Sequence, residues 1–150
     1  MINSQLWGRI NRFCKLPFSE QLLFIKTLLI GTYYSLIILF FPFSWYRKWL
    51  GVEGKISSSL LSEDMILIIK RTEKAINRVK RYCPWQIKCM AQALTAKQLL
   101  KKAKIPSTIY LGVGKEIPEK LIAHAWLQCM DITVTGKEEK SKFTPLVFFT

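Results

Sequence analysis

Residues 88–131 read KCMAQALTAKQLLKKAKIPSTIYLGVGKEIPEKLIAHAWLQCMD, and this stretch decides the fold. From Cys89 to about Lys104 the apolar residues recur at helical spacing, and Ile105-Pro106 ends the pattern. Beyond Pro106 the apolar residues alternate with other residues, which indicates strands. The stretch therefore predicts one helix followed by the first strands of a sheet.

The same change of pattern extends outward on both sides. On the N-terminal side, Ser62 is suited to cap a helix that runs to about Tyr82 and stops at Pro84, with two acids in its first turn. On the C-terminal side, Met130-Asp131 is short enough for a hairpin turn. The predicted strands cover 107–115, 123–129, 132–136 and 143–149. Helices followed by an antiparallel sheet define an α+β domain over residues 61–150.

Residues 1–60 differ in composition and are expected to form an apolar, basic helical extension. Residues 27–46, TLLIGTYYSLIILFFPFSWY, carry no charge and are close to the length that spans a bilayer. Gly31 and Pro42 interrupt this run, which favours a helical hairpin buried against the second half. A membrane span and contact with a membrane surface stay open as alternatives. Basic residues at both ends give no orientation signal.

The charge balance favours an anionic partner. The chain has 150 residues, and 23 Lys+Arg against 10 Asp+Glu give a formal net charge of +13. Nucleic acid, a lipid surface and an acidic protein or peptide all fit this charge. The basic residues are spread over both halves and no nucleic-acid motif is present, so no nucleic-acid partner is expected. The basic face of the 62–82 helix is either a solvated face or a docking surface for an acidic peptide or protein.

Cysteine usage argues against a metal site. The four cysteines are scattered without CxxC pairs, and the chain has one histidine. Neither the count nor the spacing fits a structural zinc site, and we expect no metal and no cofactor. No secretory signal is recognisable at the N-terminus. We therefore expect reduced cysteines and a cytoplasmic protein, with association to a membrane left open.

A pairing of Cys89 with His124 is the candidate chemistry. A thiol is a nucleophile as thiolate, which a helix N-terminus and a nearby histidine favour. Cys89 stands at the start of its predicted helix, and His124 follows on a strand. The alternative without catalysis is that Cys89 is a small core residue and His124 a structural side chain. Cys83 is the rival nucleophile, although it lies at the wrong end of a helix. Of the two others, Cys129 points away from His124 on its strand and Cys14 lies in the apolar half.

A resemblance to a known family strengthens this pairing. Residues 83–149 resemble the transglutaminase-like protease domain of lasso-peptide biosynthesis, a cysteine-protease fold in which a helix carrying Cys packs on an antiparallel sheet. The residues that carry the resemblance occur in the family's order: Pro84-Trp85, Cys89, Gln92-Ala93-Leu94, Lys101-Lys102, Ile105-Pro106, Leu111-Gly112-Val113, Ala123-His124-Ala125-Trp126, Val134-Thr135-Gly136 and Phe143-Thr144.

The resemblance implies a leader peptidase, with Cys89 as nucleophile and His124 as base. Such an enzyme cuts a ribosomally made precursor after its leader, and the freed amino group is then joined to an acidic side chain by an ATP-using, asparagine-synthetase-like cyclase. Residues 1–60 lack the strands of a winged-helix leader-recognition module. We therefore expect a separate leader-binding protein, as for the stand-alone peptidase of a split system.

Other members of the site are less well determined. The family usually places an acid on the strand after the histidine strand, where this chain has Thr135-Gly136. Asp131 is the nearest acid, but it falls in the predicted turn, and a hydroxyl, a backbone carbonyl or no group at all are the alternatives. The backbone N–H of Cys89 is the expected oxyanion donor, and Gln86 is a second candidate. Trp126 either covers the Cys–His pair or belongs to the core.

Two other functions remain in view. A transglutaminase-type acyl transferase would use the same Cys–His pair. A membrane-associated scaffold with a degenerate peptidase domain would use neither residue.

Overall fold

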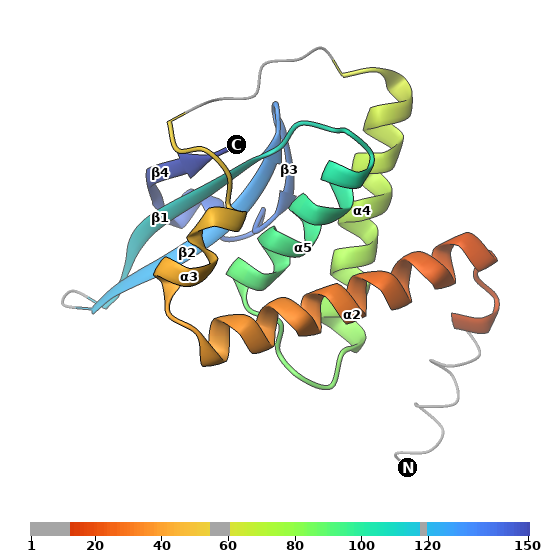
Figure 1. The fold of residues 1–150 in the computed structure, drawn as a ribbon, viewed down its shortest axis with the longest axis horizontal. Coiled ribbons are helices and arrows are strands. Elements are labelled where there is room, and N and C mark those ends of the chain that lie inside the picture. Colours follow the sequence, from red (N-terminus) through yellow and green to blue (C-terminus); the bar gives the residue numbers. More distant parts are fainter. Residues whose placement is uncertain (1–12, 55–60, 118–119) are drawn as a thin grey trace.

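The computed structural model describes residues 13–54, 61–117 and 120–150. It combines helices with one antiparallel sheet, which confirms the predicted α+β class with an N-terminal helix (Figure 1). The serine-rich stretch at 57–59, which reads as a linker between the two halves, lies outside the described residues, as do Arg9 and Arg12.

The sheet has four strands in the order β3-β2-β1-β4. They are β1 (Thr108–Ile117), β2 (Lys120–Cys129), β3 (Ile132–Thr135) and β4 (Thr144–Phe149). All neighbours are antiparallel, and β1 pairs His124 on β2 with Gly112. The turn at Met130-Asp131 joins β2 to β3 as predicted, with Met130 at φ 51°. The β3–β4 connection carries a short 3-10 helix, η2 (Lys140–Lys142).

The two central helices follow the predicted pattern. α4 (Glu63–Tyr82) begins after Ser62, whose hydroxyl accepts a hydrogen bond from the backbone N–H of Met65. α5 (Cys89–Lys102) begins at the cysteine. Both pack beside the sheet, with α5 against β2 and β1 and α4 against β3 (Figure 1). Pro84 stands in the connection between the two helices and prevents a continuous helix.

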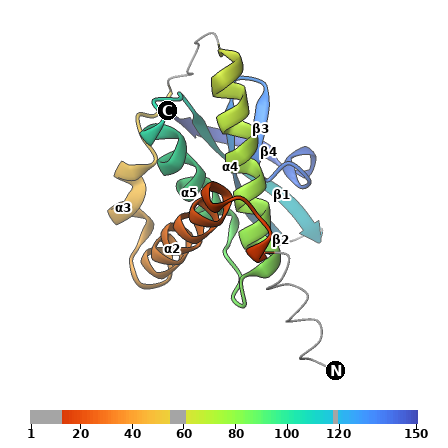
Figure 2. The ribbon, with the colours of Figure 1, turned by 90° about the vertical axis from the view of Figure 1, so that its right-hand side faces the viewer.

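The predicted helical hairpin at 27–46 is only partly correct. Gly31 does not break the helix, because α2 (Phe18–Phe40) runs through it without interruption. A glycine suits this position because an added Cβ would lie 2.9 Å from Cδ1 of Ile87. The break falls at Pro42, which precedes the short helix α3 (Phe43–Tyr46) and the 3-10 helix η1 (Arg47–Trp49). α2 crosses α4 and α5 and forms one edge of the molecule (Figures 1 and 2).

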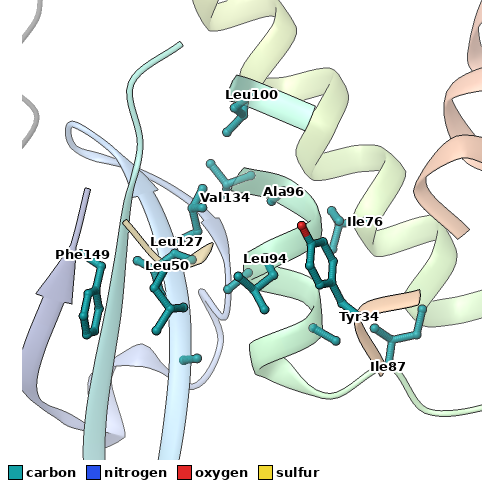
Figure 3. Close-up of a cluster of buried hydrophobic side chains, with 14 of the residues drawn as sticks. Tyr34, Leu50, Ile76, Ile87, Leu94, Ala96, Leu100, Leu127, Val134 and Phe149 are labelled. Atoms are coloured by element: carbon teal, nitrogen blue, oxygen red, sulfur yellow. The ribbon is translucent and has the colours of Figure 1, made fainter. Parts of the chain in front are cut away.

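The hydrophobic core is shared by the sheet, α5, α4 and the N-terminal part (Figure 3). Leu94 of α5 lies between Leu127 of β2 and Tyr34 of α2, and Leu50 fills the space beside the sheet. Val52 also exchanges two backbone hydrogen bonds with Thr150, an extended pairing that the sequence pattern did not predict. The division into units 1–60 and 61–150 stays a prediction, and the core crosses it.

Candidate active site

Cys89 opens α5 and is half-buried. Pro84 opens the connection from α4, and next to Cys89 the side-chain amide of Gln92 donates a 2.6 Å hydrogen bond to the carbonyl of Ile87. Ile87 is itself buried against α2. The first backbone N–H groups of a helix have no partner within the helix, so the N–H of Cys89 has no acceptor among the described residues and lies beside the thiol. This arrangement suits both a thiolate and an oxyanion.

His124 lies in the middle of β2 and is 7% exposed. Phe143 stacks on its ring with a centroid distance of 4.8 Å, and the ring of Trp126 lies 6.1 Å away on the same face of the strand. Nδ1 lies 3.3 Å from Oε2 of Glu139. Nε2 is buried and has no hydrogen-bond partner among the described residues. The second ring nitrogen is therefore unpaired within the described residues, and Gly136 lies directly against it.

The environment of His124 keeps its imidazole neutral at physiological pH. Burial lowers the pKa of His124 below its usual value of 6.5, and the charge of Lys80 acts in the same direction. The carboxylate of Glu139 and the nearby carbonyl of Gly136 partly oppose this shift. A neutral imidazole with one unpaired nitrogen is the form that a general base needs.

Glu139 is the site residue that the sequence analysis missed. It reaches His124 because Gly136, at φ 72°, starts a turn in which the carbonyl of Gly136 accepts from the N–H groups of Glu139 and Lys140. Gly136 itself faces the ring, since a Cβ built there would lie 2.7 Å from Nε2. The signal in the sequence was the Gly-Lys-Glu-Glu run at 136–139, where a flexible glycine precedes two acids. The turn after β3 thus places an acid beside the histidine, whereas the sequence analysis looked for one on the strand or at Asp131.

The structure brings α5 and β2 into contact, but it does not join Cys89 to His124 by a hydrogen bond within the described residues. Alternation along β2 turns His124 toward the 136–143 segment, whereas Ala125 and Leu127 face α5. His124 therefore lies on the face of the sheet away from α5, and pairing it with Cys89 requires a movement that brings the two side chains together.

The other predicted site residues lie around this centre. Asp131 is exposed in the β2–β3 turn, and Gln86 is exposed before α5. The hydroxyl of Thr135 accepts a 3.0 Å hydrogen bond from the N–H of Leu127, so it holds the two strands together. Trp126 is 1% exposed and stacks on Tyr110 as well as His124, which makes it a cover for the histidine.

The remaining cysteines are less suited to catalysis. Cys129 is buried in the core, and burial raises its pKa to about 12. Cys83 is half-buried at the C-terminal end of α4, where a helix disfavours a negative charge. Cys14 is exposed ahead of α2. Among the four thiols, Cys89 alone combines a helix N-terminus with partial access to solvent.

A cavity of about 870 Å³ lies at the other end of α5 and includes neither Cys89 nor His124. Its walls are aromatic and basic, with Tyr33 and Trp49 opposite Lys97 and Lys101. Burial and the charge of Lys101 lower the pKa of Lys97 to about 8. An acidic ligand would relieve this excess of positive charge.

A cysteine at a helix N-terminus, followed by a strand-borne histidine in an α+β fold, is the order of elements found in thiol-dependent acyl-transfer enzymes. Residues 39–148 match the family model described as Transglutaminase-like superfamily, and the chain belongs to that superfamily. Membership points to activity of the cysteine-protease or acyltransferase type. No curated protein and no solved structure gives a significant match to this sequence.

Proposed function

We propose that this protein is the leader peptidase of a lasso-peptide pathway, with Cys89 as nucleophile and His124 as general base. The observation that carries the proposal is the position of Cys89, half-exposed at the N-terminus of a helix that packs on the strand of the one histidine. Superfamily membership and the ordered motifs at 83–149 support it.

The reaction follows from these groups. Once a movement brings the two side chains together, His124 accepts the thiol proton through Nε2, and the sulfur of Cys89 attacks the carbonyl carbon of the last leader residue. The N–H of Cys89 stabilises the oxyanion, with Gln86 as a second donor in the connection before α5. The C–N bond then breaks, the departing amine takes the proton from His124, and an acyl-enzyme remains. Water, deprotonated by the same imidazole, releases the leader and regenerates the thiol.

Glu139 is a positioning residue in this scheme. An acid beside one ring nitrogen stabilises the imidazolium that forms when the other nitrogen accepts the proton. The 3.3 Å separation between Nδ1 of His124 and Oε2 of Glu139 supports this role. Asp131 is the alternative acid, although it is exposed in the β2–β3 turn.

The proposed partners follow from the pathway. The substrate is the precursor peptide, presented by a separate leader-binding protein, because residues 13–54 form helices and a short extended segment rather than a winged-helix module. A separate ATP-dependent cyclase uses the freed amino group. The lysine-lined cavity and the basic face of α4 are two surfaces for an acidic part of the leader or of the presenting protein. This scheme operates in the cytoplasm.

A transglutaminase-type acyl transfer is the second candidate, because it shares the acyl-enzyme and differs in the group that attacks it. An amine gives an amide cross-link, whereas water gives two fragments. A scaffold without catalysis is the third candidate, because the thiol of Cys89 and the imidazole of His124 are not hydrogen-bonded to each other within the described residues.

The test is cleavage of the cognate precursor in the presence of the leader-binding protein, followed by mass spectrometry. Cys89→Ala and His124→Ala should each abolish cleavage while circular dichroism shows an intact fold. Cys83→Ala is the matched control, since it removes a half-buried thiol six residues away and should cleave normally. Cleavage by Cys89→Ala at the wild-type rate would refute the assignment, and a cross-linked product would identify the transferase.

A further inference from the structure

α2 leaves one face without a partner in the described structure. Its inner face packs on α4 and α5 through Thr27, Gly31, Tyr34 and Ile37. Its outer face carries seven large side chains, each 45–77% exposed. We call them the outer stripe: Phe18, Leu22, Ile25, Leu29, Tyr33, Leu36 and Phe40, of which Tyr33 also contacts Trp49 at the edge of the cavity. An apolar surface of this extent marks a site of interaction.

The outer stripe is straight and as long as the helix. Its members follow one another by three or four residues, so they share one face. Eleven residues separate Phe18 from Leu29 and Leu29 from Phe40, which is close to three full turns and keeps the stripe parallel to the helix axis. With 1.5 Å of rise per residue, the stripe extends for about 33 Å. A flat surface fits this shape along its whole length.

The segment after α2 continues the same character. Phe41, Phe43 and Trp45 are all more than 40% exposed, and Phe41 stacks on Trp45 with a centroid distance of 4.4 Å. The amino group of Lys48 lies 5.4 Å from the ring of Trp45. Aromatic rings beside a lysine are typical of the interface between water and lipid.

The acidic residue of α2 lies on its inner face, whereas its lysine lies on the exposed side. Glu20 is turned inward, where Arg71 and Arg78 of α4 donate to it at 2.9 and 2.6 Å. Lys26 is exposed beside the outer stripe. No further acid occurs before Glu53, which pairs with Arg47. The outer surface is therefore apolar with basic residues at its margin.

These features favour an anionic bilayer over other occupants. Two copies of a chain with net charge +13 repel each other, whereas anionic headgroups attract it. A membrane span would fit the length and composition of α2. It would, however, place Glu20 and its two arginines in or beside lipid and remove the inner face from the core. A helix lying in the membrane interface keeps Glu20 and its arginines out of the lipid and leaves the inner face packed in the core.

We propose that the outer stripe and the Phe41–Trp45 cluster dock the protein on the surface of an anionic lipid bilayer, with α2 parallel to the membrane plane. The apolar side chains enter the boundary of the acyl chains, and the lysines contact the headgroups. This inference does not depend on the peptidase chemistry.

Sedimentation of the full chain with lipid vesicles tests the proposal. Vesicles of phosphatidylcholine mixed with phosphatidylglycerol should bind the protein, and pure phosphatidylcholine should bind it less. Replacing Leu29→Glu and Leu36→Glu together should weaken binding roughly tenfold or more, because two carboxylates then face the acyl chains. Circular dichroism checks that the variant is folded.

The matched control replaces Leu67→Glu and Leu146→Glu, two leucines of α4 and β4 that are 58% and 68% exposed. It makes the same change in net charge and should bind within roughly twofold of wild type if docking is confined to α2. Equal loss of binding in both double variants would overturn the proposal. The proposal would also be overturned if the wild-type protein stayed in solution with both kinds of vesicle, whether as a monomer or as a dimer.

Discussion

At the scale of single residues, the side-chain contacts of His124 come largely from the turn after β3, although the residue itself stands on β2. Gly136 opens the turn, Glu139 reaches Nδ1, and Phe143 covers the ring. The chain contains one histidine, so a single imidazole resonance reports on this whole arrangement. The segment 136–143 therefore acts, together with burial and Lys80, on the protonation of the proposed general base.

Glu139→Gln should lower the pKa of His124 further. The carboxylate stabilises the imidazolium, and its removal leaves burial and Lys80, which both favour the neutral ring. In an NMR titration of the imidazole, wild type should titrate below pH 6.5 and the variant lower still. Glu63→Gln, which removes an exposed acid at the start of α4, is the control. An unchanged or raised pKa in Glu139→Gln would show that the acid does not act on the ring.

Gly136→Ala should destabilise the fold by about 2–4 kcal/mol, because it adds backbone strain at φ 72° to a close contact. The new methyl group would lie 2.7 Å from Nε2 of His124 and 2.8 Å from Cβ of Trp126. Gly54→Ala separates the two effects, since φ is 79° there and nothing lies within 4 Å. It should cost about 1 kcal/mol. If urea denaturation shows the same loss of unfolding free energy in both variants, the contact with His124 does not contribute to the cost of Gly136→Ala.

The sequence indicates Cys89 and His124 because helix polarity and motif order are local properties. It does not indicate Glu139, because that contact depends on a left-handed glycine and on the path of the turn behind β3. Asp131 was the nearest acid in the sequence, yet the β2–β3 turn leaves it exposed. Proximity in sequence was a poor guide to proximity in space.

At the scale of elements, α4, α5 and all four strands lie where the sequence pattern predicts them. Their signals are local: a serine cap, a proline stop and two-residue alternation. Gly31 was misinterpreted because a glycine inside a helix costs only about 1 kcal/mol against alanine. Its close approach to Ile87, fifty-six positions later, outweighs that cost and is invisible in the local pattern.

The contact between α2 and α4 supplies a prediction at this scale. Hydrogen bonding from Arg78, followed by Arg71, lowers the pKa of Glu20 against the opposing effect of burial. Glu20→Gln should therefore destabilise the fold by about 1–2 kcal/mol at neutral pH. Because the pKa of Glu20 is lowered on folding, its stabilisation is present above about pH 4.5 and is lost as pH falls through the folded-state value.

Urea denaturation between pH 3 and 7 measures this difference. The gap between wild type and Glu20→Gln should narrow toward the acid end of that range. Glu53→Gln is the control, because its pair with Arg47 is half-exposed and should contribute less than about 1 kcal/mol. A gap that stays constant with pH would mean that the glutamine perturbs packing rather than the charge pair.

At the scale of the whole molecule, the family match and the folded core begin at different points of the sequence. The match begins at residue 39, so it leaves out nearly all of α2. The core nevertheless includes Tyr34 and Ile37 from the inner face of that helix. Sequence similarity marks the part that carries the chemistry, whereas packing marks the part that must fold together. The difference predicts how a shortened chain behaves.

A fragment of residues 41–150 should be much less stable than the full chain. It loses Tyr34 and Ile37 from the core, and full burial of one such side chain contributes about 1.5–3 kcal/mol. Their combined loss, about 3–6 kcal/mol, approaches the whole stability of an ordinary domain. Thermal unfolding of the fragment should show a lower midpoint and a broader transition. The full chain carrying Leu29→Glu and Leu36→Glu keeps the inner face and should unfold near the wild-type midpoint. If the fragment matches the full chain instead, α2 is an appendage, and its inner face contributes nothing to the stability of the domain.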